Sequence, residues 1–254
     1  METVVHHGRE TAYRETDFGA GSPVLYVHGA GGAHQVWVEQ YGPKGVGPAV
    51  AVDLTGHGDS DDADLDPGVE TIDAYADDVV AVAEATGART LVGNSMGGTV
   101  ALWVALERDL AIDRLVLCGT GAKLGVGDDL LAMLDEEFAA GVEAIHGPNL
   151  LFHDADAETV ERSKALLHDT GPAVTARDFR TCDWFDVRDR LDEIGVPALA
   201  LTGEHDGMTP PAFTEYLGEH LPDCEVELLD DCAHLSMLEL PDAWNDRVRA
   251  FLGR

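Results

Sequence analysis

Basic residues are scarce in this chain. Its 254 residues include 16 Lys and Arg against 48 Asp and Glu, so the formal net charge is −32 at pH 7. A protein with this charge repels polyanions, which excludes nucleic acid, anionic membrane surfaces and polyanionic substrates as expected partners. Lysine occurs only at Lys44, Lys123 and Lys164, and acidic residues are spread along the whole length. This distribution favours adaptation to high salt, with an ordinary acidic cytosolic protein as the alternative.

The sequence also lacks the marks of several other protein classes. Its four cysteines form no CxxC pair and have no zinc-site spacing, so we expect most of them to be buried thiols. No run approaches the roughly 20 apolar residues of a membrane helix. Residues 1–7 lack the basic start and apolar stretch of a signal peptide, and no GxGxxG or GKS/GKT loop is present. We therefore expect a soluble, cytoplasmic protein.

Short apolar runs alternate with longer segments of helical period. Because 45% of the residues are hydrophobic, the chain can bury one sizeable core. Most of the runs are continuous, as is typical of strands buried on both faces of a parallel sheet. They lie at residues 24–28, 49–53, 90–93, 114–118, 198–203 and 226–229. The fold class indicated is α/β, a doubly wound and mostly parallel sheet covered by helices.

Three further segments complete the predicted organisation. Residues 3–17 alternate loosely, which favours an antiparallel hairpin at one edge of the sheet. Residues 72–83 have apolar side chains at helical spacing, with Asp78 and other acidic residues outside the apolar stripe. Residues 121–184 have helical periods near 130–138 and 159–167 but no core strand. We expect them to form a helical cap inserted into a core of residues 1–120 and 185–254.

One short motif suggests a nucleophile. Residues 93–97 read GNSMG, a GxSxG pattern that follows the strand at 90–93 and precedes helical residues 98–106. Strand, sharp turn and helix are the context of a nucleophile elbow. The two glycines leave room for a strained backbone at Ser95. Ser95 is therefore the predicted nucleophile, and a serine that merely caps a helix is the alternative.

A serine nucleophile requires a base, and histidine is the usual one. Among eleven histidines, His234 lies just after the last predicted strand and just before the closing helix. His57 and His205 are the rivals, but we interpret His57 as part of a structural turn and His205 as a neighbour of the acid. The predicted base is therefore His234.

The acid that orients this base is expected at the same edge of the sheet. The strand at 198–203 ends in Glu204, His205 and Asp206, and we choose Asp206. The resulting order of serine, aspartate and histidine along the chain is the one that accompanies a nucleophile elbow. Glu204, Asp230 and Asp231 are the fallback candidates.

An oxyanion needs N–H donors that already point at the developing charge. Residues 28–32 read HGAGG and follow the first predicted core strand, so the N–H of Ala30 is one candidate donor. The N–H of Met96 is the other, because it begins a helix whose positive end favours negative charge. A plain glycine-rich turn is the alternative.

These motifs, together with DLTGHGDS at 53–60, TGEHDGMTP at 202–210 and CAHLSMLELPD at 232–242, resemble the α/β-hydrolase superfamily over nearly the whole chain. Residues 115–125 and 182–210 resemble the small-cap branch that contains 3-oxoadipate enol-lactonases and uncharacterised carboxylesterases. The resemblance implies a serine hydrolase that cleaves a small-molecule ester or lactone with no cofactor and no metal.

Other activities occur on the same framework. Haloalkane dehalogenases and epoxide hydrolases have an aspartate at the elbow, where this chain has Ser95. Perhydrolases, carbon–carbon bond hydrolases, hydroxynitrile lyases and thioesterases share the triad, and a non-catalytic ligand receptor is the alternative from another class. The cap is expected to roof the carboxyl edge of the sheet. Candidate pocket residues are Trp184, Phe185 and Met208, with packing as their alternative role.

Overall fold

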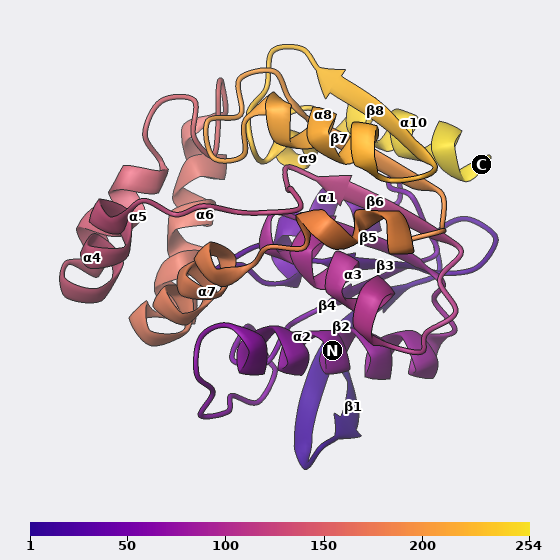
Figure 1. Ribbon diagram of the computed structural model, residues 1–254, viewed down its shortest axis with the longest axis horizontal. Helices are drawn as coiled ribbons and strands as arrows, with labels where there is room; N and C mark the ends of the chain where they lie inside the picture. The colour runs from indigo at the N-terminus through magenta and orange to yellow at the C-terminus, as the bar shows by residue number, and fades with distance from the viewer.

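The computed structural model describes residues 1–254. Its eight strands form one sheet in the order β1-β2-β4-β3-β5-β6-β7-β8 (Figure 1). Strands β3 to β8 run parallel, whereas the β1–β2 hairpin joins β4 antiparallel. The predicted fold class, all six core strands and the edge hairpin are confirmed. The strands are β1 (Glu2–His6), β2 (Arg9–Thr16), β3 (Val24–Val27), β4 (Ala49–Val52), β5 (Thr90–Asn94), β6 (Arg114–Cys118), β7 (Ala198–Gly203) and β8 (Cys224–Leu229).

Helices cover both faces of the sheet. The α-helices are α1 (Val38–Tyr41), α2 (Val69–Thr86), α3 (Met96–Glu107), α4 (Asp128–Glu136), α5 (Phe138–Ile145), α6 (Ala157–Thr170), α7 (Pro172–Trp184), α8 (Pro211–His220), α9 (Ser236–Glu239) and α10 (Pro241–Leu252). Two 3-10 helices are η1 (His34–Trp37) and η2 (Arg188–Glu193). None of these helices has the length and apolar content needed to cross a membrane.

Alternate residues of each core strand face two separate apolar clusters. In β3, Leu25 and Val27 pack with residues of α2, α3 and α8. Val24 and Tyr26 of the same strand face the other cluster, which includes Trp244 of α10. Because both faces of the strand are buried, the sequence pattern is a continuous apolar run.

Four helices, α4 to α7, lie between β6 and β7 in the chain and stand to one side of the sheet (Figure 1). We call them the inserted helices. An antiparallel bridge between Lys123 and Asp186 brings the two ends of this segment together. Apolar side chains from the inserted helices, such as Leu134 and Leu167, join the cluster on the α10 face of the sheet.

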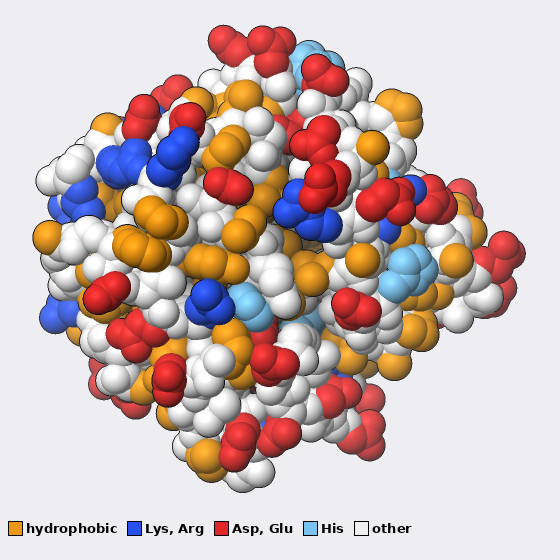
Figure 2. All heavy atoms as spheres, turned by 180° about the vertical axis from the view of Figure 1, so that it is seen from behind, with side chains coloured by type: hydrophobic (Ala, Val, Ile, Leu, Met, Phe, Trp, Pro, Cys, Tyr) orange, Lys and Arg blue, Asp and Glu red, His pale blue; other side chains and the backbone are white.

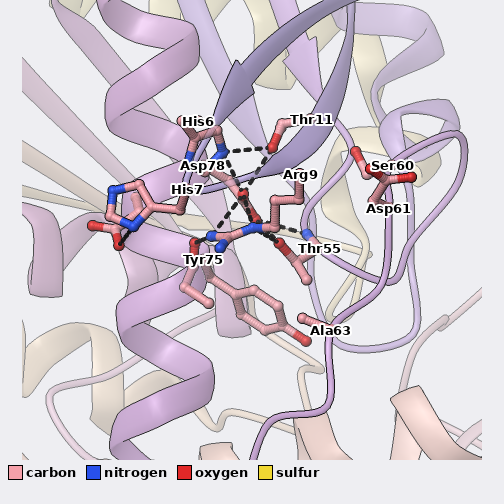
Figure 3. A network of polar contacts seen from close by, with 12 residues as sticks. His6, His7, Arg9, Thr11, Thr55, Ser60, Asp61, Ala63, Tyr75 and Asp78 are labelled. Atoms are coloured by element: carbon pink, nitrogen blue, oxygen red, sulfur yellow. Dashed lines mark hydrogen bonds and ion pairs between the residues drawn. The ribbon is translucent and has the colours of Figure 1, made fainter.

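One acidic residue of α2 does not lie where the apolar stripe places it. Asp78 is fully buried beneath the β1–β2 hairpin (Figure 3). One of its carboxylate oxygens accepts hydrogen bonds from the Thr55 amide and hydroxyl, each at 2.7 Å. The other accepts from the Thr11 hydroxyl at 2.8 Å and lies 3.3 Å from an Arg9 nitrogen. A buried carboxylate requires such donors, so the stripe alone misplaces Asp78.

Candidate active site

Ser95 occupies the turn between β5 and α3. Its backbone has φ 54° and ψ −120°, a region that residues with a side chain rarely adopt. The Ser95 amide donates to the Cys118 carbonyl at 2.9 Å, and the Thr120 hydroxyl donates to the Ser95 carbonyl at 2.8 Å. Strain of this kind persists only where surrounding contacts hold it. The turn therefore presents the Ser95 side chain at the carboxyl edge of the sheet.

The glycines on both sides of the turn are required by close backbone contacts. A Cβ atom at Gly93 would lie 2.2 Å from the Gly97 carbonyl oxygen. A Cβ atom at Gly97 would lie 2.2 Å from the carbonyl oxygen of Val27 in β3. A side chain at Gly93 would therefore push β5 away from the start of α3, and one at Gly97 would push α3 away from β3.

The structure brings Asp206 and His234 into direct contact. Asp206 follows β7, His234 follows β8, and both are 2% exposed. The Nδ1 atom of His234 lies 2.9 Å from Oδ2 of Asp206. If Nδ1 carries the proton that is donated to this carboxylate, the Nε2 lone pair is free to accept a proton. This is the tautomer that a general base needs.

Hydrogen bonds hold the Asp206 carboxylate in its ionised form. Burial raises the pKa of Asp206, but the neighbouring His234 and several donors outweigh this effect, so the pKa lies below its usual value. The donors are the amides of Met208 and Thr209 and the hydroxyls of Thr202 and Thr209, at 2.7 to 2.9 Å. These threonines flank the acid in the sequence, and that spacing could have identified them.

Ser95 and His234 line the same small cavity, but no hydrogen bond joins their side chains. Nucleophile and base are often farther apart without substrate than during reaction. A second cavity of about 400 Å³ also reaches Ser95 and lies under the inserted helices. Met208 and Phe179 line both cavities. A larger open hollow of about 750 Å³ beside α7 touches none of the three predicted triad residues.

The HGAGG segment forms a tightly held loop after β3. Burial and the neighbouring His57 lower the pKa of His28 to about 4, so its ring is neutral. The Leu54 amide donates to Nε2 of His28 at 3.1 Å, which leaves Nδ1 to donate to the Gly29 carbonyl at 2.8 Å. Ala30, the next residue, lines both cavities at Ser95. Met96 is fully buried as the first residue of α3.

A residue that the sequence analysis did not single out fixes the same loop. Asp178 of α7 is fully buried, and its Oδ2 accepts the Gly31 amide at 2.8 Å. The same oxygen lies 2.8 Å from Nε2 of His57, and Oδ1 accepts the Tyr75 hydroxyl at 2.5 Å. Asp178 lies in a polar helical stretch, ARDFR, which gives no signal of burial.

The rival residues lie outside the cavities at Ser95. His57 is fully buried against Asp178, consistent with its interpretation as part of a structural turn. His205 is stacked on His153 with ring centroids 3.9 Å apart. The fallback acids Glu204, Asp230 and Asp231 are exposed.

The expectation that Trp184 and Phe185 line the pocket is wrong. Trp184 is 47% exposed and packs edge-on against Trp103 of α3, and Phe185 is fully buried in the core. Phe179 faces the cavity instead. Trp184, the last residue of α7, lies five positions after Phe179, about 7.5 Å further along the helix axis. Met208, the third candidate, does line the cavities.

Comparisons with known proteins agree with this fold. A family model described as "Alpha/beta hydrolase family" matches residues 24–247. A pimeloyl-acyl-carrier-protein methyl ester esterase of Neisseria meningitidis serogroup C is 28% identical over 245 residues, covering 90% of this chain and 93% of the relative. A solved structure of a thermophilic esterase superimposes with a TM-score of 0.87 at 28% identity, covering 99% of this chain and 96% of that chain. The enol-lactonase from Burkholderia xenovorans LB400 gives a TM-score of 0.81 at 25% identity, with both chains fully covered.

Proposed function

The chain belongs to the alpha/beta hydrolase family, and from this premise we propose that it cleaves carboxylic esters or lactones through a Ser95, His234 and Asp206 triad. The observation that carries the proposal is the 2.9 Å contact between Nδ1 of buried His234 and Oδ2 of buried Asp206. His234 also lines the same cavity as Ser95. Similarity to an esterase and an enol-lactonase supports the same bond type.

In the proposed mechanism, His234 removes the proton from the Ser95 hydroxyl as its oxygen attacks the carbonyl carbon. The N–H groups of Ala30 and Met96 hold the resulting oxyanion. His234 then protonates the leaving alcohol, and an acyl group remains on Ser95. Water, deprotonated by His234, releases the acid and restores the serine. Asp206 keeps the imidazole oriented and stabilises its cationic form.

The walls of the cavities favour an uncharged substrate. Apolar side chains dominate the lining of the 400 Å³ cavity, and Asp129 is the charged side chain among them. No lysine or arginine lines either cavity at Ser95, so a substrate carboxylate would find no cation there. We propose that residues 121–184 act as a cap over this space and that Met208 contacts the acyl group. A neutral ester or lactone with an apolar acyl group fits these walls best.

Substitution of the triad tests the proposal. Ser95→Ala and His234→Ala should each lower kcat for p-nitrophenyl acetate by about 10⁴ or more, and Asp206→Asn should be milder. The double variant of Ser95 and His234 should be little worse than either single one, because the residues act as a unit. A fluorophosphonate probe should label the wild-type chain at Ser95 only, as read by peptide mass spectrometry.

Two exposed residues supply the controls. Ser22→Ala and His220→Ala each remove a side chain that lines neither cavity at Ser95, and both variants should keep wild-type turnover. Near wild-type hydrolysis by Ser95→Ala would show that another group is the nucleophile. Weak ester turnover beside fast cyanohydrin cleavage or peracid formation would instead favour a lyase or a perhydrolase.

A further inference from the structure

Three potential metal ligands meet at the surface, outside the catalytic machinery. His153 lies in the loop between α5 and α6, His205 follows β7, and Asp231 follows β8. One ligand atom from each of the three lies within 4.8 Å of the other two. Segments from three separate parts of the chain therefore converge on one point.

We propose that His153, His205 and Asp231 bind a divalent transition-metal ion of the Zn²⁺ class. Imidazole nitrogen suits Zn²⁺, Ni²⁺ and Cu²⁺, whereas Mg²⁺ and Ca²⁺ prefer an all-oxygen site. Ligand atoms around a tetrahedral Zn²⁺ lie about 3.3 Å apart, given bonds near 2.0 Å. The side chains must close a remaining gap of at most about 1.5 Å by this geometry. His153 and Asp231 are exposed and His205 is half-buried, so their rotamers can adjust.

Neighbouring groups already orient the two histidines. Nδ1 of His153 lies 2.8 Å from the Asn149 side-chain oxygen, so that nitrogen is the donor and Nε2 is left with a free lone pair. This outer hydrogen bond is the usual support of a metal-binding histidine. Glu204 lies 3.2 Å from Nε2 of His205 and also accepts the Asp231 amide at 3.2 Å. Glu204 can therefore orient His205 or provide a fourth ligand.

The imidazole rings of His153 and His205 are stacked, with their centroids 3.9 Å apart. Because a histidine binds a metal through a lone pair in its ring plane, one of the two rings must turn about its side-chain bonds to share an ion with the other. Asp231 adopts a left-handed backbone with φ 58°, which an aspartate tolerates and which turns it toward the histidines. Asp231 provides a negative charge and an oxygen ligand beside the two imidazole nitrogens.

A bound ion would link the loop of residues 146–156 to the core beside the triad. This loop already contacts both triad-bearing loops. The Gly207 amide donates to the Asn149 carbonyl at 2.8 Å, and the Leu235 amide donates to the Leu151 carbonyl at 3.0 Å. Because these partners lie next to Asp206 and His234, a metal bridge would reduce the opening of this junction.

Calorimetric titration with Zn²⁺ tests the inference on the full chain after treatment with a chelator. Excess Mg²⁺ is present to saturate acidic sites that offer only oxygen ligands. One Zn²⁺ should bind per chain. His153→Ala should weaken binding at least tenfold, since even outer-shell changes cost about 10–100-fold. Asp231→Asn, which keeps the left-handed turn, should also weaken binding. Co²⁺ at the same site should give a visible d–d absorption that His153→Ala removes.

The matched control is His220→Ala, which removes another exposed histidine on α8 that lies outside the cluster. It should bind Zn²⁺ like the wild type. Zn²⁺ should also slow amide hydrogen exchange in residues 146–156 of the wild type and not of His153→Ala. Equal Zn²⁺ affinity in wild type, His153→Ala and Asp231→Asn would overturn the inference. Failure of the wild-type chain to bind Zn²⁺ in excess Mg²⁺ would overturn the inference as well. Neither result depends on esterase activity.

Discussion

The buried pair of Asp178 and His57 links α7 to the loop that carries the proposed oxyanion donor. Burial lowers the pKa of His57, but the charge of Asp178 and its hydrogen bond raise it more, so the pKa lies above its usual value despite nearby Arg177. Burial raises the pKa of Asp178, but His57 and the donors from Tyr75 and Gly31 bring it below its usual value. Both shifts favour the charged form of the residue, so the folded structure stabilises the ion pair.

This pair should give the protein a specific pH dependence. The raised pKa of His57 contributes stability that is complete below the unfolded value of about 6.5. That contribution is lost as the pH rises through the folded pKa. The lowered pKa of Asp178 contributes stability above the usual aspartate range, which is lost as the pH falls through the folded pKa. The melting temperature should therefore decline on the alkaline side for this reason, as measured by circular dichroism across pH.

Asp178→Asn isolates the contribution of the pair. Removing one partner of a buried ion pair costs about 3–5 kcal/mol, so urea denaturation should show a loss of this size. In this variant His57 is buried without its anion, and the alkaline decline should disappear. Asp135→Asn is the control. Asp135 lies on α4 and forms an exposed pair with Arg180, which lies on α7 like Asp178. Breaking this pair should cost under about 1 kcal/mol. Parallel pH profiles for wild type and Asp178→Asn would refute the assignment.

At the residue scale, the sequence places a side chain well when that side chain follows a buried strand. Ser95, Asp206 and His234 could be placed at one edge because parallel strands end together there. Asp78 and Asp178 could not be placed, because their burial depends on donors from distant segments, such as Thr55 and Gly31. Trp184 and Phe185 were misassigned because residue type does not specify which end of α7 faces the cavity.

At the scale of the elements, α4 forms one wall of the 400 Å³ cavity. Leu130 lines this cavity and is partly exposed, so a larger side chain can extend into the space. Leu130→Trp should shorten the acyl chain that fits. We expect kcat/KM for p-nitrophenyl octanoate to fall about tenfold or more and that for the acetate to change little, since each lost methylene contact is worth about 1–3 kcal/mol.

The next residue provides a matched control. Leu131 is also partly exposed and, like Leu130, packs against the core cluster, but it does not line the cavity. Leu131→Trp should leave the ratio of octanoate to acetate rates unchanged. If both variants change that ratio equally, the effect comes from a general disturbance of α4 and the cavity assignment is wrong.

The elements themselves were predicted more completely than their packing. Continuous apolar runs gave the six core strands, and helical spacing gave α2, because burial on a sheet or a helix face leaves a local pattern. The inserted helices have weaker patterns. They pack mainly against one another, and side chains such as Leu134 and Leu167 also join the apolar cluster on the α10 face of the sheet. Local periodicity contains no information about which face of the sheet they join.

At the scale of the whole molecule, the excess of acidic residues governs the response to salt. Figure 2 shows Asp and Glu side chains scattered over one face with few Lys and Arg among them. An exposed surface of 10199 Å² and a net charge of −32 correspond to a mean charge spacing of about 18 Å. With a Debye length of about 10 Å at 0.1 M salt, about a sixth of the repulsion between neighbours remains, and at 1 M almost none.

The melting temperature should therefore rise between 0.1 and 2 M KCl, as measured by differential scanning calorimetry. Screening favours the folded state because the unfolded chain can spread the same charges further apart. Sulfate salts are unsuitable, since they also strengthen apolar burial. A variant with ten exposed carboxylates changed to Asn or Gln should lose much of the salt dependence. A melting temperature that is flat across KCl concentrations would contradict adaptation to high salt.

The bridge between Lys123 and Asp186 has a consequence for how such a protein can diversify. Both ends of the inserted segment meet at one point beside adjacent strands β6 and β7. β6 and β7 are parallel, so a crossover connection joins them. Because the ends of the insertion adjoin, it is equivalent to a short loop within that crossover, and its length imposes little constraint on strand register. Residues 124–185 can therefore lengthen, shorten or be exchanged by recombination between homologous genes, while the register of β6 on β7 and the elbow at Ser95 are inherited unchanged.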